Sequence, residues 1–291
     1  MSARMLVGLI GMDIGGSLSP ALHEDAFAAA GMVGHYHLMD AARPRRGLPE
    51  LLAAVRLAGF SGVNVTFPFK EAVMALLDEV SPEAAEIGAV NTVVIDEAGR
   101  CSGHNTDRLG FRGAFREHLG EQAVRGRPVL LLGAGGAGRA VAFALTDLGA
   151  GRLHIHDVEE ARAAALCADL GRRFGVGCAV VTPDAVAGAA AADVIVNATP
   201  VGMKGHEGLP MATGSIEARH VVADVIYTPL ETAFLAVARG RGARTMGGAG
   251  MCVHQAAEAF RLFTGRGAHL GRMHAAFAAA AGRRDSRPTG G

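Results

Sequence analysis

A run of apolar residues that leads directly into closely spaced glycines constrains the fold of this chain most strongly. Val129-Leu130-Leu131-Leu132 has the composition of a buried strand, and Gly133-Ala134-Gly135-Gly136-Ala137-Gly138 after it fits the pattern G-x-G-x-x-G. An apolar segment of helical character follows over residues 139–148. The first glycine of such a unit permits a tight turn, the second admits a pyrophosphate, and the third lets the helix pack on the strand. The pattern predicts a Rossmann-type dinucleotide-binding domain; the alternative is a tight turn that binds no ligand.

Asp157 indicates which dinucleotide this domain prefers. The residue follows a predicted strand over residues 153–156 and lies 19 residues beyond Gly138, where an acidic side chain would bind the ribose hydroxyls. A 2′-phosphate about 4 Å from this carboxylate would be repelled by roughly 4 kcal/mol per pair of unit charges at an effective dielectric constant of about 20. Residues 158–160 supply no cation, and the sequence leaves the direction of Arg162 open. We therefore expect NAD to be favoured over NADP.

Strand-like and helix-like segments alternate before the glycine-rich loop. Strands are predicted near residues 5–10 and 62–66, and helices near 20–30, 50–58 and 69–77. This alternation is typical of βαβ units and predicts a parallel sheet. The character of the chain changes near residue 108, where a helix over 110–119 is expected to connect two domains. The predicted class is α/β with two domains, followed by a charged, Gly- and Pro-containing tail over 283–291 that we expect to be disordered.

Composition excludes several classes of function. The 28 basic and 28 acidic residues balance, and the arginines are scattered, so we expect no nucleic-acid partner. No uninterrupted apolar stretch of about 20 residues occurs, so we expect no membrane span. The four cysteines form no CxxC pair, and the N-terminus lacks the features of an export signal. These features predict a reduced, cytoplasmic protein.

Lys70 is unusual because only two of the 28 basic residues are lysine. An arginine cannot give up its proton near neutral pH, whereas a lysine that is partly buried or placed among charges can. Lys70 is therefore a candidate for proton transfer, and an incidental surface lysine is the alternative. Asp107 could supply the neighbouring carboxylate, or it could cap the helix that follows it.

Short polar clusters near the ends of predicted strands are further candidates. Ser17 and Ser19 place two hydroxyls just before a helix that begins with Pro20. One hydroxyl would suffice as a helix cap, and the pair together with free N–H groups could hold a carboxylate. Asn91 precedes a β-branched strand and could bind a ligand or satisfy backbone groups.

Together these segments resemble the shikimate dehydrogenase family, in family order and from residue 8 to about 265. The matching segments are Ser17-Leu18-Ser19-Pro20, Asn64-Val65-Thr66 with Pro68 and Lys70, Gly88-Ala89-Val90-Asn91-Thr92, Asn105-Thr106-Asp107, the loop Gly133 to Gly138, Asn197-Ala198-Thr199-Pro200 with Gly202-Met203, Asp224-Val225-Ile226-Tyr227 with Pro229 and Thr232, and Gly250-Met251 leading to Gln255.

The resemblance implies a reversible, nicotinamide-dependent interconversion of shikimate and 3-dehydroshikimate, a step toward chorismate and the aromatic amino acids. It implies a substrate-binding and catalytic domain over residues 1–108, a Rossmann domain over 109–246 with a cleft between the two, and C-terminal helices over 247–282 that pack back on the substrate domain. The resemblance implies a small-molecule substrate as the partner and no metal. We expect the protein to be a monomer or a homodimer. His254 receives no role.

The resemblance also assigns roles to single residues. Lys70 would be the catalytic lysine and Asp107 its acidic partner, because reduction of a ring ketone leaves an alkoxide that needs a proton. Ser17 and Ser19, helped by Tyr227, would bind the substrate carboxylate. The ring hydroxyls would be held or supported by Asn64, Thr66, Asn91 and Gln255. The cofactor would be bound by Gly133, Ala134, Gly135, Gly136, Ala137, Gly138, Asp157, Thr199, Val225 and Gly248.

One segment departs from the NADP-using pattern. His156-Asp157-Val158-Glu159-Glu160 stands where NADP-using members usually have an Asn-Arg-Thr type segment, and it is similar to the NAD-using quinate/shikimate branch. Oxidation of quinate is therefore an alternative, although Ser19 favours shikimate because some quinate-preferring relatives have threonine there. An aminoshikimate dehydrogenase is a further alternative. A non-catalytic NAD-sensing module is the alternative of a different class, and Lys70 and Asp107 speak against it.

Overall fold

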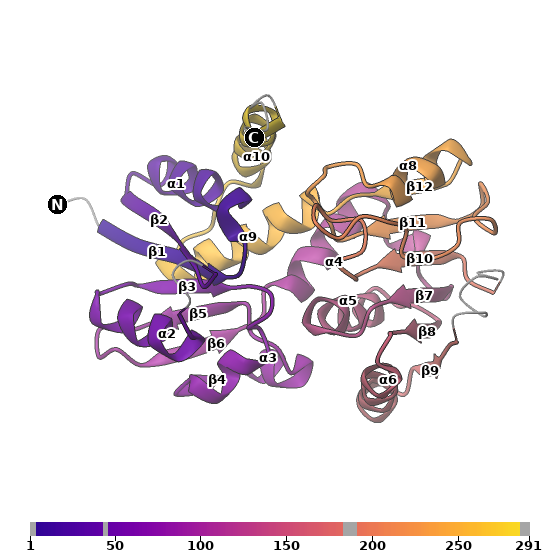
Figure 1. Ribbon diagram of the computed structural model, residues 1–291, viewed down its shortest axis with the longest axis horizontal. Coiled ribbons are helices and arrows are strands. Elements are labelled where there is room, and N and C mark those ends of the chain that lie inside the picture. Colours follow the sequence, from indigo (N-terminus) through magenta and orange to yellow (C-terminus); the bar gives the residue numbers. More distant parts are fainter. Residues whose placement is uncertain (1–3, 43–45, 183–190, 286–291) are drawn as a thin grey trace. The chain divides into compact units, whose positions relative to one another are not determined.

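The computed structural model describes residues 4–42, 46–182 and 191–285, which fall into two compact units (Figure 1). The first unit comprises Met1–Thr106 together with Val253–Gly291, and the second comprises Asp107–Cys252. Each unit contains one six-stranded sheet. Both are α/β, in agreement with the predicted fold class.

The sheet of the first unit is mixed, with the strand order β2-β1-β3-β5-β6-β4. Its strands are β1 (Arg4–Gly11), β2 (Val33–Asp40), β3 (Gly62–Val65), β4 (Glu79–Val80), β5 (Thr92–Ile95) and β6 (Cys101–His104). The prediction of a parallel sheet is right for β1, β2 and β3, but β5 is antiparallel to both β3 and β6. Asp96 explains the difference, because its Oδ1 accepts hydrogen bonds from Ala98 N and Arg100 N and closes a short hairpin between β5 and β6.

Apolar side chains of the strands and of the helix α2 (Leu48–Leu57) form one core cluster of the first unit. The buried cluster includes Ile10, Leu52, Val63 and Val93. The other helices near the sheet are α1 (Ser19–Ala29) and α3 (Pro82–Ile87), with the short 3-10 turn η1 (Ile14–Gly16) before α1. The core is close-packed and therefore rigid. The polar segments that connect the strands lie at the ends of this sheet.

The predicted helix over residues 69–77 is wrong. The chain forms turns after residue 66 and then only a 3-10 turn, η2 (Ala72–Leu76). A regular helix would need the carbonyl of Lys70 to accept from the backbone N–H of residue 74. That carbonyl instead accepts from Val90 N at 2.8 Å, and Met74 N donates to Glu71 O. The tertiary hydrogen bond therefore replaces the helical one.

The C-terminal helices α9 (Ala249–Thr264) and α10 (Leu270–Asp285) contribute to the first unit from Val253 onward. Arg272 on α10 pairs with Asp25 on α1 at 2.8 Å, and Phe260 on α9 lies with its ring 5.3 Å from that of Phe27. The prediction that the chain is disordered from residue 283 is wrong for its first residues, because α10 continues to Asp285. Residues 286–291 lie outside the described residues.

The sheet of the second unit is parallel throughout, with the order β12-β11-β10-β7-β8-β9. Its strands are β7 (Pro128–Leu132), β8 (Arg152–His156), β9 (Gly177–Val180), β10 (Val194–Asn197), β11 (Val221–Asp224) and β12 (Arg244–Met246). Its helices are α4 (Asp107–His118), α5 (Gly136–Asp147), α6 (Glu160–Phe174) and α8 (Ala233–Gly240), with η3 (Glu121–Ala123) after α4. The order reverses beside β7, as in a doubly wound dinucleotide-binding fold.

Two of the four cysteines are joined, which corrects the expectation that all are reduced. Cys167 on α6 and Cys178 on β9 form a disulfide with their Cα atoms 5.2 Å apart. The pair is 11 residues apart in sequence, and the return of the chain from α6 to the neighbouring strand brings it together without a CxxC motif. Cys101 and Cys252 are buried thiols. Among the described residues no helix has the length and apolarity needed to cross a bilayer.

Candidate active site

One end of the first unit's sheet gathers most of the predicted substrate-binding residues. In the strand register Asn64 on β3 lies beside Thr92 on β5, and Thr92 lies beside His104 on β6. Because β5 runs antiparallel to its neighbours, its N-terminal end meets the C-terminal ends of β3 and β6. Asn91 and Thr106, which flank these strands, are therefore drawn to the same end as Asn64.

The side-chain amide of Asn64 is held by three protein groups. Its Nδ2 donates to the backbone O of Asn91 at 3.2 Å and to Thr92 Oγ1 at 3.0 Å. Its Oδ1 accepts from the Tyr36 hydroxyl at 2.9 Å. Asn64 is 7% exposed, so an unmet donor here would be costly. Asn64 thus acts as a support that fixes the Asn91 segment.

Asn91, Thr106 and Gln255 continue this network. Asn91 Nδ2 donates to Thr106 Oγ1 at 2.9 Å, and Asn91 Oδ1 accepts from Thr106 N at 2.8 Å. Thr106 Oγ1 donates to Gln255 Oε1 on α9 at 3.3 Å. The structure therefore brings Asn64, Asn91 and Gln255, which are far apart in sequence, into one hydrogen-bonded group.

Lys70 lies on the segment that follows β3, and that segment is anchored along its length. Thr66 N donates to Ile10 O on β1 at 2.9 Å, and Phe69 N donates to Thr66 O at 2.9 Å. The bond from Val90 N to the Lys70 carbonyl places Lys70 beside the chain that leads into Asn91. The Lys70 side chain is half-buried. Lys70 thus shares the sheet end with Thr66 and Asn91.

Asp107 opens the second unit. It is the first residue of α4 and is 5% exposed. A carboxylate in the first turn of a helix interacts favourably with the helix dipole. The two predicted catalytic side chains therefore come from different units, Lys70 from the first and Asp107 from the second.

Ser17 and Ser19 lie together at the start of α1. The Ser17 hydroxyl donates to Ser19 Oγ at 3.1 Å and accepts from Ser19 N at 3.2 Å. The preceding loop is held by Asp40, whose Oδ1 accepts from Asp13 N at 3.0 Å. Two adjacent hydroxyls at a helix N-terminus are suited to an anion such as a carboxylate. Tyr227, the third predicted carboxylate ligand, belongs to the second unit.

The glycine-rich loop of the second unit has the backbone geometry that a dinucleotide requires. Gly133 has φ 97°, and a Cβ there would lie 2.9 Å from Ala198 O. A Cβ on Gly138 would lie 2.0 Å from Gly133 O, so the third glycine is needed for α5 to pack on β7. At Gly135 the space is open, with Arg162 Nη1 as the nearest atom at 3.8 Å. The residues present therefore fit a pyrophosphate at the N-terminus of α5.

Asp157 is attached to the same loop. Its Oδ2 accepts from Ala134 N at 2.7 Å, and its Oδ1 accepts from Glu159 N at 2.8 Å. Arg162 pairs with Glu159 at 3.1 Å, and its guanidinium is directed toward Gly135. The carboxylate thus stands at the end of β8 beside the glycine turn, and Arg162, the cation near Gly135, is already paired with Glu159.

A buried polar network orders the loops after β10 and β11. Asn197 Nδ2 donates to Asp224 Oδ1 at 3.1 Å, and Asn197 Oδ1 accepts from the Thr199 hydroxyl at 2.7 Å. Asp224 also accepts from Ile226 N at 3.0 Å and from the Thr232 hydroxyl at 2.8 Å. Burial raises the pKa of Asp224, and these hydrogen bonds act in the opposite direction.

Val225 and Gly248 approach each other through their backbones beside this network. A Cβ on Gly248 would lie 2.1 Å from Val225 O, and Gly248 N donates to Ile226 O at 3.0 Å. Glycine is therefore the residue that permits this approach. The structure brings the predicted cofactor residues Val225 and Gly248 together, and the Asn197–Asp224 bond connects their loop to that of Thr199.

Sequence reasoning missed Tyr36 and the supporting role of Asp224. Tyr36 lies between His35 and His37 on β2 and is buried, with its hydroxyl on Asn64. A weak signal was present, because the chain has only two tyrosines. Asp224 follows an apolar run, which is where a residue at the carboxyl end of a parallel strand is expected. His254, which had no predicted role, lies with its ring 5.9 Å from that of His274.

Comparison with known proteins identifies the family of this chain. Residues 9–93 match the model of the shikimate dehydrogenase substrate-binding domain. A protein named quinate/shikimate dehydrogenase (NAD(+)) from Corynebacterium efficiens is 46% identical over 281 residues, which cover 94% of this chain and 97% of that protein. The chain belongs to the shikimate dehydrogenase family.

Relatives at similar identity within this family carry different cofactors in their names. A protein named shikimate dehydrogenase (NADP(+)) from Streptomyces avermitilis is 48% identical over 283 residues, which cover 95% of this chain and 96% of that protein. A solved structure of quinate dehydrogenase from Corynebacterium glutamicum in complex with NAD is 40% identical, with a TM-score of 0.88 and coverage of 96% of this chain and 100% of that one. Overall identity to family members thus leaves the choice between NAD and NADP to the residues of the site.

Proposed function

We propose that this chain is a dehydrogenase that interconverts shikimate and 3-dehydroshikimate, with NAD as the preferred cofactor and quinate as a second substrate. The observation that carries the proposal is the joint presence of two intact assemblies. The first unit has the polar cluster around Asn64, Asn91 and Lys70, and the second has the glycine-rich loop bound to Asp157. Relatives named for shikimate and for quinate are both above 45% identical or of closely matching structure.

In this proposal Lys70 exchanges the proton at the C3 oxygen of the substrate, and Asp107 supports the ammonium. The bound nicotinamide supplies or accepts the hydride. A protonated lysine next to the reacting oxygen would stabilise the developing alkoxide and protonate it. Ser17 and Ser19 would orient the ring by binding its carboxylate, assisted by Tyr227. Thr66 and Gln255 would contact ring hydroxyls, while Asn64 would hold the Asn91 segment in place.

Asp157 is the basis for proposing NAD. Its carboxylate follows β8 and holds the Ala134 N–H, so a 2′-phosphate bound to the ribose would meet a negative charge. Val158 is 95% exposed and offers no compensating cation. A relative from S. avermitilis that is named for NADP is 48% identical, so the proposal of NAD rests on Asp157 and not on overall identity.

The proposal is tested by measuring reduction of NAD and of NADP with shikimate and with quinate as substrates, in a two-by-two comparison. We expect turnover with shikimate and NAD to have the highest kcat/KM. Absence of turnover with every pair would favour a non-catalytic NAD-sensing module, and a higher kcat/KM for quinate would make quinate the main substrate.

The cofactor assignment is tested with Asp157→Asn combined with Val158→Arg. Asparagine keeps one oxygen for the Ala134 N–H, while the new arginine can pair with a 2′-phosphate. We expect the ratio of kcat/KM for NADP to that for NAD to rise about tenfold or more, which corresponds to about 1.4 kcal/mol. Val158→Arg alone is the matched control. An unchanged ratio in the double variant would show that Asp157 does not select the cofactor.

A further inference from the structure

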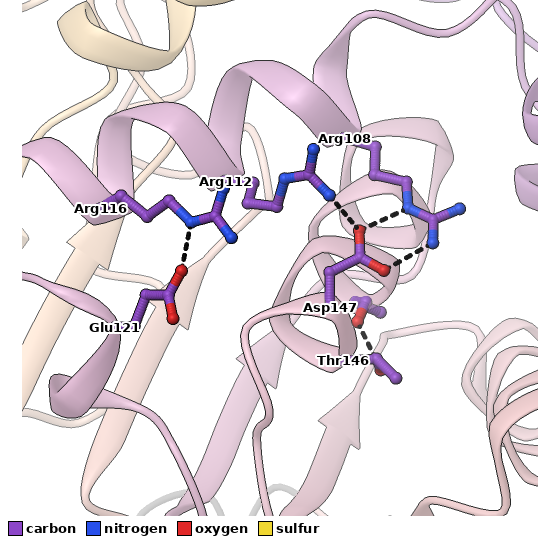
Figure 2. A network of polar contacts seen from close by, with 7 residues as sticks. Arg108, Arg112, Arg116, Glu121, Thr146 and Asp147 are labelled. Atoms are coloured by element: carbon purple, nitrogen blue, oxygen red, sulfur yellow. Dashed lines mark hydrogen bonds and ion pairs between the residues drawn. The ribbon is translucent and has the colours of Figure 1, made fainter.

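The first turn of α4 carries Asp107 and Arg108, and Arg108 is held by α5 within the second unit (Figure 2). Arg108 Nε and Nη2 donate to the two carboxylate oxygens of Asp147 at 2.8 and 2.7 Å. Asp147 is the last residue of α5, and the two side chains are 15% and 16% exposed. Two parallel charge-assisted hydrogen bonds fix the position of the guanidinium and the orientation of its plane.

Aromatic rings hold the same guanidinium from another direction. The Arg108 Cζ atom lies 5.3 Å from the centroid of the Phe143 ring and 6.0 Å from that of the Phe174 ring. The two rings meet edge to face with their centroids 5.5 Å apart, and Phe143 is fully buried. A planar guanidinium can stack on the face of an aromatic ring, and a lysine ammonium does not reproduce this contact. Arg108 is thus fixed against both α5 and the end of α6.

Among the residues that the structure describes, the arginines that pair with Asp147 lie in the N-terminal half of α4. Arg112, one turn beyond Arg108, places its Nη1 3.4 Å from Asp147 Oδ2. Arg116, a further turn along, pairs instead with Glu121 at 2.5 Å. Figure 2 shows Arg108 and Arg112 converging on Asp147, whereas Arg116 is bonded to Glu121. Asp147 therefore anchors the end of α4 that begins with Asp107.

We propose that the Arg108–Asp147 pair positions the Asp107 carboxylate for proton transfer. Asp107 and Arg108 are neighbours in one hydrogen-bonded turn, so the direction in which Asp107 leaves the helix follows from the fixed rotation of α4 about its axis. Asp107 is 5% exposed and has little room to compensate for a rotation. The inference rests on the proposed function, in which Asp107 supports the catalytic lysine, and Arg108 and Asp147 act through Asp107 without touching the substrate.

The test uses Asp147→Asn and, separately, Arg108→Lys, each made in the parent chain and in Asp107→Asn. In the parent chain we expect each substitution to lower kcat by about tenfold or more with KM values changed by less than about twofold, since a displacement of about 1 Å can cost up to 100-fold. In the Asp107→Asn background the same substitutions are expected to change kcat by less than about twofold, because residues that act as a unit are not additive.

Glu121→Gln is the matched control, because it also removes a carboxylate that pairs with an arginine of α4 but lies beyond the last turn of that helix. We expect its kcat to equal that of the parent. Thermal unfolding of every variant shows whether the chain is folded. If Asp147→Asn does not fold, Arg108→Lys carries the test, because it keeps the charge while removing the paired hydrogen bonds and the guanidinium contact with the aromatic rings.

The outcomes separate this inference from the proposed function. A normal kcat in Asp107→Asn would overturn the proposed role of Asp107 and the positioning role with it. A slow Asp107→Asn, combined with Asp147→Asn and Arg108→Lys that leave kcat unchanged or lower it by the same factor in both backgrounds, would overturn the positioning role alone. A fall in kcat that occurs in the parent chain and disappears in the Asp107→Asn background would support the positioning role.

Discussion

His23 is expected to make the first unit sensitive to mild acid. This residue of α1 is fully buried, and its ring stacks on Tyr36 with centroids 4.7 Å apart, while the rings of Phe27 and Phe263 lie at 6.5 and 6.0 Å. Within the ranges that the structure describes, neither ring nitrogen has a hydrogen-bond partner. Burial among these rings lowers the pKa of His23 from 6.5 to about 3, because a charged ring would not be solvated.

The size of the effect follows from the two pKa values. The folded chain keeps His23 neutral down to about pH 3, whereas the unfolded chain takes up a proton near pH 6.5. The stability that comes with the neutral ring is therefore fully present above pH 6.5 and is lost as the pH falls from 6.5 toward 3. One proton bound only by the unfolded chain changes the free energy of unfolding by about 1.4 kcal/mol per pH unit. Lowering the pH from about 7.5 to about 5 should cost about 2 kcal/mol.

The assay compares the parent with His23→Met, in which a flexible apolar side chain of similar size replaces the ring. Urea unfolding followed by far-ultraviolet circular dichroism gives the free energy of unfolding at both pH values. The difference between variant and parent removes the contribution of carboxylates, and it should increase by about 2 kcal/mol at the lower pH. His37→Gln, at an exposed histidine of β2, is the control and should follow the parent. Equal losses of stability in His23→Met and the parent would refute the reasoning.

Two further predictions concern the proposed catalytic lysine and the buried acid of the second unit. Lys70→Ala should lower kcat by roughly 100-fold or more while shikimate binding, measured by calorimetry, changes little, because the lost contribution is proton transfer; near-normal turnover would contradict the proposed role. Asp224→Asn should be at least as stable as the parent at neutral pH. The pKa of Asp224 is raised in the folded chain, so the parent loses stability as the pH rises above the pKa that Asp224 has in the unfolded chain. The neutral amide of asparagine avoids that loss. Asp224→Ala should lose about 1–3 kcal/mol for each donor left unpaired, as measured by urea unfolding, and equal stability of the two variants would show that the network contributes nothing.

The parts of the molecule that were predictable from sequence are those fixed by local interactions. The glycine-rich loop is one, because Gly133 needs a positive φ and Gly138 needs to lack a Cβ, and both requirements arise within six consecutive residues. The position of Asp157 after β8 is another, since strand, turn and acid follow one another directly. In these cases the sequence pattern and the structural cause occupy the same short segment.

The parts that were not predictable depend on contacts between distant segments. The carbonyl of Lys70 accepts from Val90 N, which removes the expected helix, and no local pattern reports that bond. Cys167 and Cys178 meet because α6 returns to β9. Arg108 and Asp147 are 39 residues apart, and each is an ordinary surface residue type for a helix. Their pairing becomes visible only when α4 and α5 are packed together.

The polar residues of the first unit show why residue type alone assigns roles poorly. Asn64 was a candidate for a substrate hydroxyl, yet both of its N–H groups and one acceptor position are taken by Asn91, Thr92 and Tyr36. Removing any one of these partners would leave a buried donor or acceptor unmet, at a cost of about 1–3 kcal/mol. Tyr36 in turn is stacked on His23. The geometry at the sheet end is therefore maintained by a chain of contacts that begins in the aromatic core. Because the folded chain keeps His23 neutral down to about pH 3, mild acid should lower the population of the folded chain and leave this geometry intact within it.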